Sequence, residues 1–184
     1  SGATGTPATG YLDRVISVQA NLNDTGGVVN GPLTIDPFDA TDVAILSGVI
    51  SSSDPYHILS KDGNGILELT GNNTYTGATA IAHGVLIVSS DANLGVAPTS
   101  AYALNTSIAT PGAAATPGAV IINSGATLAT DTSFTLSDTR TILLASGTGG
   151  AASASNIDVA GTGTTLTFGG QISDYIGEKG ALNK

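Results

Sequence analysis

The chain is a succession of short apolar runs separated by polar turns rich in Gly, Asn, Asp and Pro. Within the runs, aliphatic residues alternate with polar ones, and this period of two predicts β-strands that are buried on one face. The strongest strand signal lies at residues 66–90. Other strand-like runs occur at residues 15–18, 28–29, 33–35, 43–46, 119–128, 134–136, 141–144, 157–159 and 164–168.

A short pattern recurs along the chain. Residues 28–35 and 81–88 share the order aliphatic-x-x-Gly-x-Leu-x-aliphatic without a gap, and looser copies occur at 122–128 and 163–168. In such a pattern, a tight turn at glycine enters a strand whose alternate aliphatic residues share one face. The recurrence predicts a repeat architecture rather than a single irregular sheet.

A longer internal match points the same way. Residues 48–61 parallel residues 170–184, because both stretches begin with Gly-x-Ile-Ser and end with Leu-x-Lys. The first copy continues into further strand-like sequence, whereas the given sequence ends with the second. We therefore expect a fragment of a longer repetitive array.

A unit as short as this repeat cannot bury its aliphatic face alone. Stacking successive units buries a continuous column, in which each inward Leu, Ile or Val contributes about 1.5–3 kcal/mol. Stacked parallel strands also pair their backbones at a spacing of about 4.8 Å. The sequence therefore predicts an all-β fold, a β-solenoid covering residues 11–184. Residues 1–10 are expected to be a flexible segment or a remnant of cloning. The Pro-, Ala- and Thr-rich residues 95–118 are expected to form a long surface loop.

The polar stretch Gly-Asn-Asn-Thr-Tyr-Thr-Gly at residues 71–77 separates two apolar runs. Gly and Asn tolerate left-handed backbone, and Asn and Thr side chains can bond neighbouring backbone groups. We interpret the stretch as a corner between two faces of the solenoid, not as a binding site. The structural motif that we predict comprises Gly71, Asn72, Asn73, Thr74, Tyr75, Thr76, Gly77, Gly84, Leu86 and Val88.

Residues 59–95, and above all the order Leu-Thr-Gly-Asn-Asn-Thr-Tyr-Thr-Gly at 69–77, closely resemble the passenger-associated transport repeat of autotransporter passengers. The resemblance implies a right-handed parallel β-helix outside the outer membrane of a Gram-negative bacterium, with the repeat assisting export. It also implies attachment of the full-length protein through an outer-membrane barrel, which nothing in this sequence resembles.

The chain departs from the usual repeat at Val85 and Ile87. Alternation points Leu86 and Val88 inward, so Val85 and Ile87 should face outward, where the family mostly places polar residues. A contiguous apolar strip on a surface is usually covered or binds something. We expect cover by the 95–118 loop first, a lateral contact between two passengers second, and otherwise an error of register in the alternation.

Charge and composition restrict the classes of binding partner. Five Lys and Arg against 14 Asp and Glu give a net charge of −9, which disfavours nucleic acid and anionic membrane surfaces. No run approaches the roughly 18 apolar residues of a membrane span. The absence of cysteine suits a chain that is exported unfolded, although it also suits a cytosolic protein. The N-terminus lacks the features of a signal peptide, so either the chain is cytosolic or its targeting part lies outside this sequence.

Candidate chemistry is sparse, and we predict no catalytic, cofactor-binding or metal site. His57 and His83 have no cysteine partner, and surface histidines are the simpler interpretation. The stretch that contains Asp62 and Asn64 weakly resembles a calcium-binding loop, but it lacks the full series of acidic ligands, so a turn is expected. Paired catalytic carboxylates could in principle come from Asp24, Asp36, Asp39, Asp42 and Asp54, although acidic turn residues are the default.

The function that we predict is a non-enzymatic passenger fragment acting as an adhesive or self-associating stalk. Its partner would be a host or bacterial surface ligand, protein or glycan, or another passenger copy. Two alternatives stay open at this point: a polysaccharide-cleaving enzyme on a β-helix, and a β-sandwich adhesin module with antiparallel strands.

Overall fold

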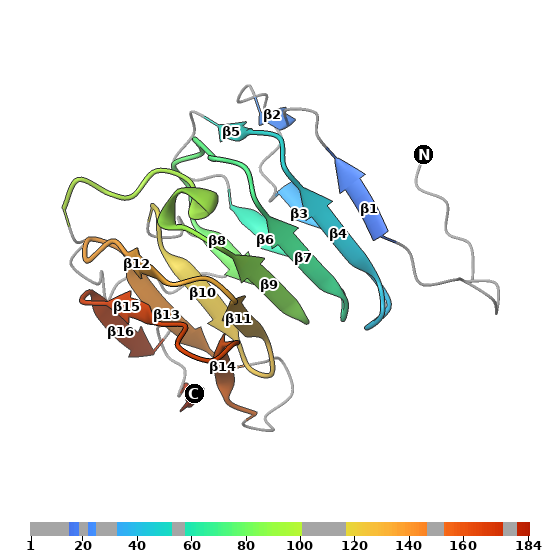
Figure 1. The fold of residues 1–184 in the computed structure, drawn as a ribbon. Coiled ribbons are helices and arrows are strands. Elements are labelled where there is room, and N and C mark those ends of the chain that lie inside the picture. Colours follow the sequence, from blue (N-terminus) through green and yellow to red (C-terminus); the bar gives the residue numbers. More distant parts are fainter. Residues whose placement is uncertain are drawn as a thin grey trace.

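The computed structural model describes residues 15–18, 22–24, 33–52, 58–100, 117–146, 153–174 and 180–184. The predicted flexible segment 1–10 and the middle of the predicted 95–118 loop lie outside these ranges. In the described part, short strands form a stack of coils that runs in chain order from β1 at one end to β16 and β17 at the other (Figure 1).

The first sheet contains seven strands, one from each coil that the structure describes, in the order β1-β4-β7-β9-β11-β14-β17. Every neighbouring pair in it is parallel. The strands are β1 (Val15–Val18), β4 (Val43–Leu46), β7 (Ile66–Leu69), β9 (Val85–Val88), β11 (Thr127–Thr130), β14 (Ser155–Val159) and β17 (Leu182–Asn183).

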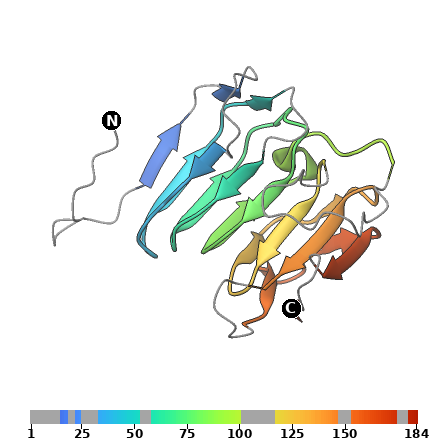
Figure 2. The same ribbon diagram turned by 180° about the vertical axis from the view of Figure 1, so that it is seen from behind.

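The second sheet lies behind the first and repeats the same chain order, which Figure 2 shows as a run of colours from blue to red. Its neighbouring strands are also all parallel. The strands are β3 (Leu33–Ile35), β6 (Leu59–Lys61), β8 (Thr79–Ile81), β10 (Val120–Asn123), β13 (Thr141–Ala145) and β16 (Gln171–Asp174).

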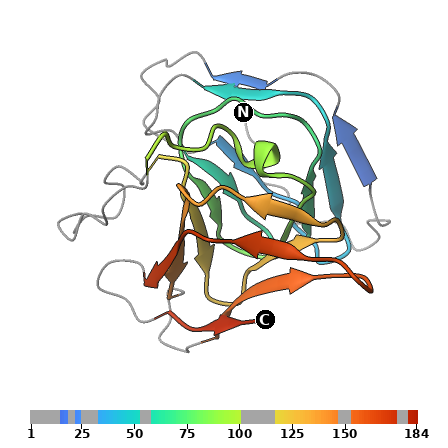
Figure 3. The ribbon, with the colours of Figure 1, turned by 60° about the vertical axis from the view of Figure 1, so that its left-hand side comes forward.

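A third face connects the first sheet to the second within each coil. Two short parallel pairs lie on it, and between them the chain passes through the polar corner at 70–78 and a short 3-10 helix. Seen along the stack in Figure 3, the faces surround a common interior. The elements are β2 (Leu22–Asp24), β5 (Ile50–Ser52), β12 (Phe134–Leu136), β15 (Leu166–Phe168) and η1 (Asp91–Leu94).

This architecture confirms the predicted all-β parallel β-helix. The β-sandwich alternative is wrong for the part of the chain that the structure describes, because all of its strand pairs are parallel rather than antiparallel. The right-handed sense implied by the resemblance is also the sense of nearly all parallel β connections.

Inward side chains form ladders from coil to coil. In the first sheet one ladder continues in strict register through the residues Ala44, Leu67, Leu86, Leu128 and Ile157. Leu67 and Leu86 are fully buried and Leu128 is 1% exposed, so the centre of the column is closed to bulk solvent. Ala44 and Ile157, nearer the two ends of the stack, are only partly buried.

A second apolar cluster lies on the outer face of the second sheet. Ile121 and Leu143 are partners in adjacent strands, at 6% and 5% exposure. Ala119 and Ala145 extend the cluster along the strands, and both are buried. As a result, all five residues of β13 are buried, which the alternating pattern did not predict.

The structure corrects two of the sequence matches. Leu33 and Ile35 belong to the second sheet, whereas Leu86 and Val88 belong to the first, so the two pairs are not equivalent positions. Residues 28–32, with the predicted strand at 28–29, lie outside the described residues. Lys61 is likewise in the second sheet, while the Leu182–Asn183 strand is in the first. Both matches rest on the alternation of aliphatic and polar residues along a strand. This alternation is the same in the strands of every sheet, so it cannot show in which sheet a strand lies.

The looser match at 122–128 is the structurally correct one. Ile122 pairs with Ile81, and Leu128 pairs with Leu86, so the two stretches occupy the same corner of successive coils. The stretch at 122–128 has one residue more at this corner than the stretch that begins at Ile81. A match that requires identical spacing therefore does not detect that the two are equivalent.

Candidate functional site: the repeat corner and the clamp beside it

The corner at 70–78 links β7 to β8, as the sequence predicted, and its centre is a buried amide. Asn73 is 5% exposed; its Oδ1 accepts a hydrogen bond from the Ile50 amide at 2.8 Å, and its Nδ2 donates to the Asn93 carbonyl at 2.6 Å. Because Ile50 and Asn93 lie in the coils on either side, one side chain ties three coils together.

Asn93, in the next coil, extends this polar column. Its Oδ1 accepts from the amides of Ser89 and Ser90, both at 2.9 Å, and its Nδ2 donates to the Gly71 carbonyl at 2.9 Å. Asn93 is 1% exposed, and each polar atom of its amide has a partner. Buried amides whose hydrogen bonds are all formed fix the register of the coils. A change of register would break these bonds, and each buried donor or acceptor left without a partner costs about 1–3 kcal/mol.

The other residues of the predicted motif take structural positions. Gly71 and Gly77 are buried, whereas Asn72 and Thr74 face solvent. A Cβ on Gly71 would lie 2.3 Å from the Gly48 carbonyl oxygen, so only glycine fits this close approach. The backbone amide of Thr74 donates to the Ile50 carbonyl at 2.9 Å.

Tyr75 turns inward from the corner and packs in the main core. Its hydroxyl lies 2.6 Å from Thr79 Oγ1, which satisfies the one polar atom that the ring carries inside. Burial raises the pKa of Tyr75 well above its usual value of 10.0, so the phenol stays neutral.

The backbone carbonyl of Thr76, the next residue of the motif, accepts a hydrogen bond from the amide of Gly118 at 3.1 Å.

Gly84 and Leu86 define the next turn and strand. Gly84 has φ +65°, a left-handed conformation, and a Cβ there would lie 2.4 Å from the Gly65 carbonyl oxygen. Leu86 and Val88 point into the core at 0% and 1% exposure.

Lys61 occupies an interior position that the sequence analysis did not single out. It lies in register between Ile35 and Ile81, and it is fully buried. Its Nζ donates to the carbonyls of Asp62 at 2.7 Å, Gly63 at 2.7 Å and His83 at 3.1 Å. The three N–H groups of an ammonium match these three acceptors at the turn between the second sheet and the first.

Two effects oppose each other at Lys61. Burial lowers its pKa to about 8, and the charges of Asp36 and Asp62 offset part of that effect. The three carbonyls also favour the ammonium form, so Lys61 is mainly protonated at neutral pH and binds a proton less tightly than in the unfolded chain.

We expect this depressed pKa to appear as a pH dependence of stability. Between pH 8 and 10 the unfolded chain holds the Lys61 proton more fully than the folded chain, so the free energy of unfolding rises with pH. In chemical denaturation, the unfolding free energy of the wild type minus that of Lys61→Met should increase across this window. Lys184→Met controls for the removal of an exposed lysine. A difference that stays flat or falls would contradict the role assigned to burial.

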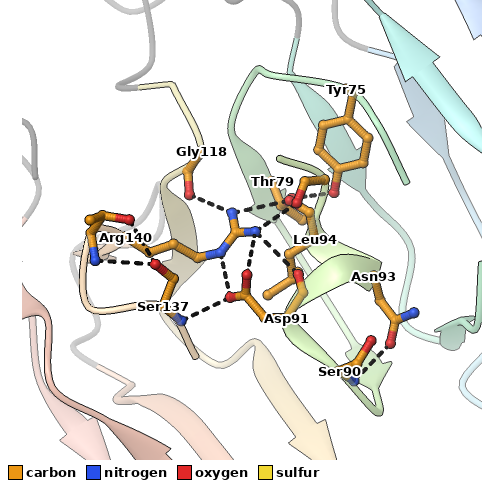
Figure 4. A network of polar contacts seen from close by, with 11 residues as sticks. Tyr75, Thr79, Ser90, Asp91, Asn93, Leu94, Gly118, Ser137 and Arg140 are labelled. Carbon is orange, nitrogen blue, oxygen red and sulfur yellow. Dashed lines mark hydrogen bonds and ion pairs between the residues drawn. The ribbon is translucent and has the colours of Figure 1, made fainter. Parts of the chain in front are cut away.

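A clamp centred on Arg140 lies beside the corner (Figure 4). Arg140 is 1% exposed, and its Nε and Nη2 bind the carboxylate of Asp91 at 2.7 and 3.1 Å. The guanidinium also donates to the carbonyls of Leu94 at 3.2 Å, Gly118 at 2.9 Å and Gly95 at 2.7 Å. The amide of Ser137 adds a bond of 3.0 Å to Asp91 Oδ1. A buried arginine with this many acceptors is a structural cross-link between coils.

The predicted apolar strip lies on the outer face of the first sheet. Val85 and Ile87 are half-buried, in contrast to the inward Leu86 and Val88. The strip extends beyond this strand, because Val85 is in register with Ile66 and, through it, with Val43. Glu68 and Ala129 flank Ile87 in the adjacent strands.

Those of the titratable residues singled out from the sequence whose side chains the structure describes lie in the segments between strands. His83 Nδ1 lies 2.7 Å from Asp62 Oδ1, and both side chains are largely exposed. The bonds that Asp62 accepts from His83 and from the Gly63 amide lower its pKa. Asp42 Oδ2 accepts from the Asp39 amide at 3.1 Å. Within the described residues, no group of three His, Asp or Glu side chains could hold a metal ion. His57 and Asp54 lie outside the described residues, as does the side chain of Asp24.

No helix in the described part of the chain combines the length and the hydrophobicity needed to cross a bilayer.

Comparison with known proteins supports the resemblance. The family model of the passenger-associated transport repeat matches residues 59–88, from β6 to the end of β9, which is shorter than the predicted 59–95. The chain is also 46% identical over 79 residues to an adhesin, the BmaC autotransporter of Brucella suis biovar 1 (strain 1330). That match covers 43% of this chain and 2% of the relative. No solved structure gives a significant match.

These findings confirm that the chain carries the repeat and resembles an autotransporter passenger. They support a passenger role and a location on the cell surface, outside the outer membrane.

Proposed function

We propose that this chain, with its transport repeat at 59–88, is a non-enzymatic stretch of a passenger stalk that serves adhesion or self-association. The observation that carries the proposal is the position of the repeat at the centre of the coil stack. Its buried side chains, Asn73, Tyr75 and Lys61, all bond to the protein's own backbone or side chains. A residue whose polar atoms are all bonded within the protein stabilises a scaffold and has little hydrogen-bonding capacity left with which to bind a substrate.

The repeat itself is proposed to assist export through folding. Each coil that stacks adds backbone pairs and inward aliphatic contacts to the coil before it, so stability accumulates along the chain. Asn73 and Asn93 make this accumulation specific for one register, because their bonds require the adjacent coils. Folding outside the membrane would then oppose the return of the chain.

We propose that self-association uses the apolar strip on the outer face of the first sheet, which contains Val85 and Ile87. The described ends of the 95–118 segment do not favour cover by that loop. Val96 donates to the Tyr75 carbonyl and Gly118 to the Thr76 carbonyl, so both ends lie at the corner that leads into the second sheet. Val43, Ile66 and Val85 together form an apolar row across three coils, suited to a second copy of the same surface.

The double change Val85→Thr, Ile87→Thr tests this role. Threonine keeps the β-branched shape that suits a strand but removes apolar contact area. If two copies meet through the strip, sedimentation should show weaker self-association at nearly unchanged stability. If the strip is covered by the chain's own loop, stability falls modestly and the oligomeric state does not change.

A test on intact cells separates self-association from binding to host cells. Cells that display an autotransporter whose passenger carries this chain should lose clumping with the double variant if self-association is the function. Clumping that persists at equal surface display, together with unchanged binding to host cells, would contradict a role for this strip in either kind of adhesion.

A further inference from the structure

The 95–118 segment is held at both of its ends by the same side chain. Arg140 Nη2 donates to the Gly95 carbonyl at 2.7 Å, and Nη1 donates to the Gly118 carbonyl at 2.9 Å. Gly95 follows η1 directly, and Gly118 comes just before β10. One guanidinium therefore spans the base of the segment, where the chain leaves the coil and returns to it.

Backbone hydrogen bonds to the repeat corner also hold the two ends. The Val96 amide donates to the Tyr75 carbonyl at 2.9 Å, and the Gly118 amide donates to the Thr76 carbonyl at 3.1 Å. The Gly118 amide lies 3.2 Å from the Gly77 carbonyl as well. Gly95 has φ +73°, and a Cβ there would lie 2.4 Å from the Tyr75 carbonyl oxygen, so its backbone packs directly on the repeat corner. The base thus rests on the corner from one side and on Arg140 from the other.

The orientation of Arg140 is itself fixed by Asp91, as Figure 4 shows. Nε and Nη2 approach the two carboxylate oxygens at 2.7 and 3.1 Å, which is a bidentate pair. Nη2 also donates to the Asp91 carbonyl at 3.1 Å. Asp91 begins η1, so the same ion pair holds the helix that leads into the segment.

Arg140 belongs to the following coil. It immediately precedes β13, 45 residues after Gly95 and 22 after Gly118. The bonds at the base therefore join the coil that contains β11 and β12 to the coil that contains η1.

We infer that Arg140 is a latch, a positioning residue that closes the base of the 95–118 segment only when the next coil is in place. The latch makes the closure of this base, at Gly95 and Gly118, depend on the stacking of the next coil. A passenger that has folded only through η1 would hold the repeat corner but leave the base open. The inference concerns this chain's own fold and stands whether or not the segment binds a partner.

Amide hydrogen exchange on the folded protein separates a latch from a general core residue. In Arg140→Lys, which keeps the charge but loses the planar fork, and in Asp91→Asn, which loses the partner charge, the amides of Val96 and Gly118 should exchange at least about tenfold faster. Amides inside β7 and β9 should keep their wild-type rates. Asp138→Asn removes an exposed carboxylate from the turn beside Arg140 and is the matched control.

Two outcomes would overturn the latch. Exchange that accelerates equally at the base and inside β7 and β9 shows that Arg140 only stabilises the whole stack. Unchanged exchange at Val96 and Gly118 shows that the base is closed without it. If Arg140→Lys fails to fold, the milder Asp91→Asn decides between these outcomes through the same amides.

Discussion

Leu86→Ala is expected to lower the free energy of unfolding by about 2–5 kcal/mol. Leu86 is fully buried in register between Leu67 and Leu128, so truncation leaves a cavity inside the central coils. The adjacent Val85→Ala should cost less than about 1.5 kcal/mol, because Val85 is half-buried on the outer face.

Denaturant unfolding of both variants gives the comparison directly. The two positions are neighbours in one strand, so backbone propensity and sequence context are closely matched. A larger loss at Val85 would mean that the alternation of this strand is assigned the wrong way round, and equal losses would contradict the difference in burial between the two positions.

Asn73→Ala is expected to destabilise the protein by about 2–4 kcal/mol, since a buried amide and a buried carbonyl each lose a partner. The donor left behind is the Ile50 amide, and the acceptor left behind is the Asn93 carbonyl. Asn72→Ala, one residue earlier and exposed, should stay within about 0.5 kcal/mol of the wild type.

Thermal and chemical unfolding of this second pair tests whether the corner is a structural cross-link between coils. A small effect at Asn73 would show that water or a shifted backbone replaces its bonds, and the polar column would then carry little stability.

Much of the fold was readable from the sequence because its signals are local. Alternation at 85–88 and the polar stretch at 71–77 predicted the strand and the corner, and both are present. Stacking followed from the recurrence of these units. The face on which a strand lies was not readable, because the alternating pattern is the same in the first and second sheets. This is why Leu33 and Ile35 were matched with the wrong strand.

The clamp and the interior lysine were missed for a different reason. Arg140 and Asp91 are 49 residues apart, and each resembles an ordinary surface charge until the coils are stacked. Lys61 alternates with Leu59 as an inward residue would, which was the available signal for its burial. A lysine at an aliphatic position of a strand is normally taken to face solvent, and only the carbonyls of the turn make its burial tolerable.

The measurement that tests the central claim most directly is surface display of an autotransporter whose passenger carries this chain, with Asn73→Ala compared with Asn72→Ala. Antibody labelling of intact cells, normalised to total passenger, gives the fraction displayed. If folding of the repeat corner supports export, Asn73→Ala lowers that fraction and Asn72→Ala leaves it at the wild-type level. Equal display of the two variants, despite a measured loss of stability in Asn73→Ala, would contradict the claim.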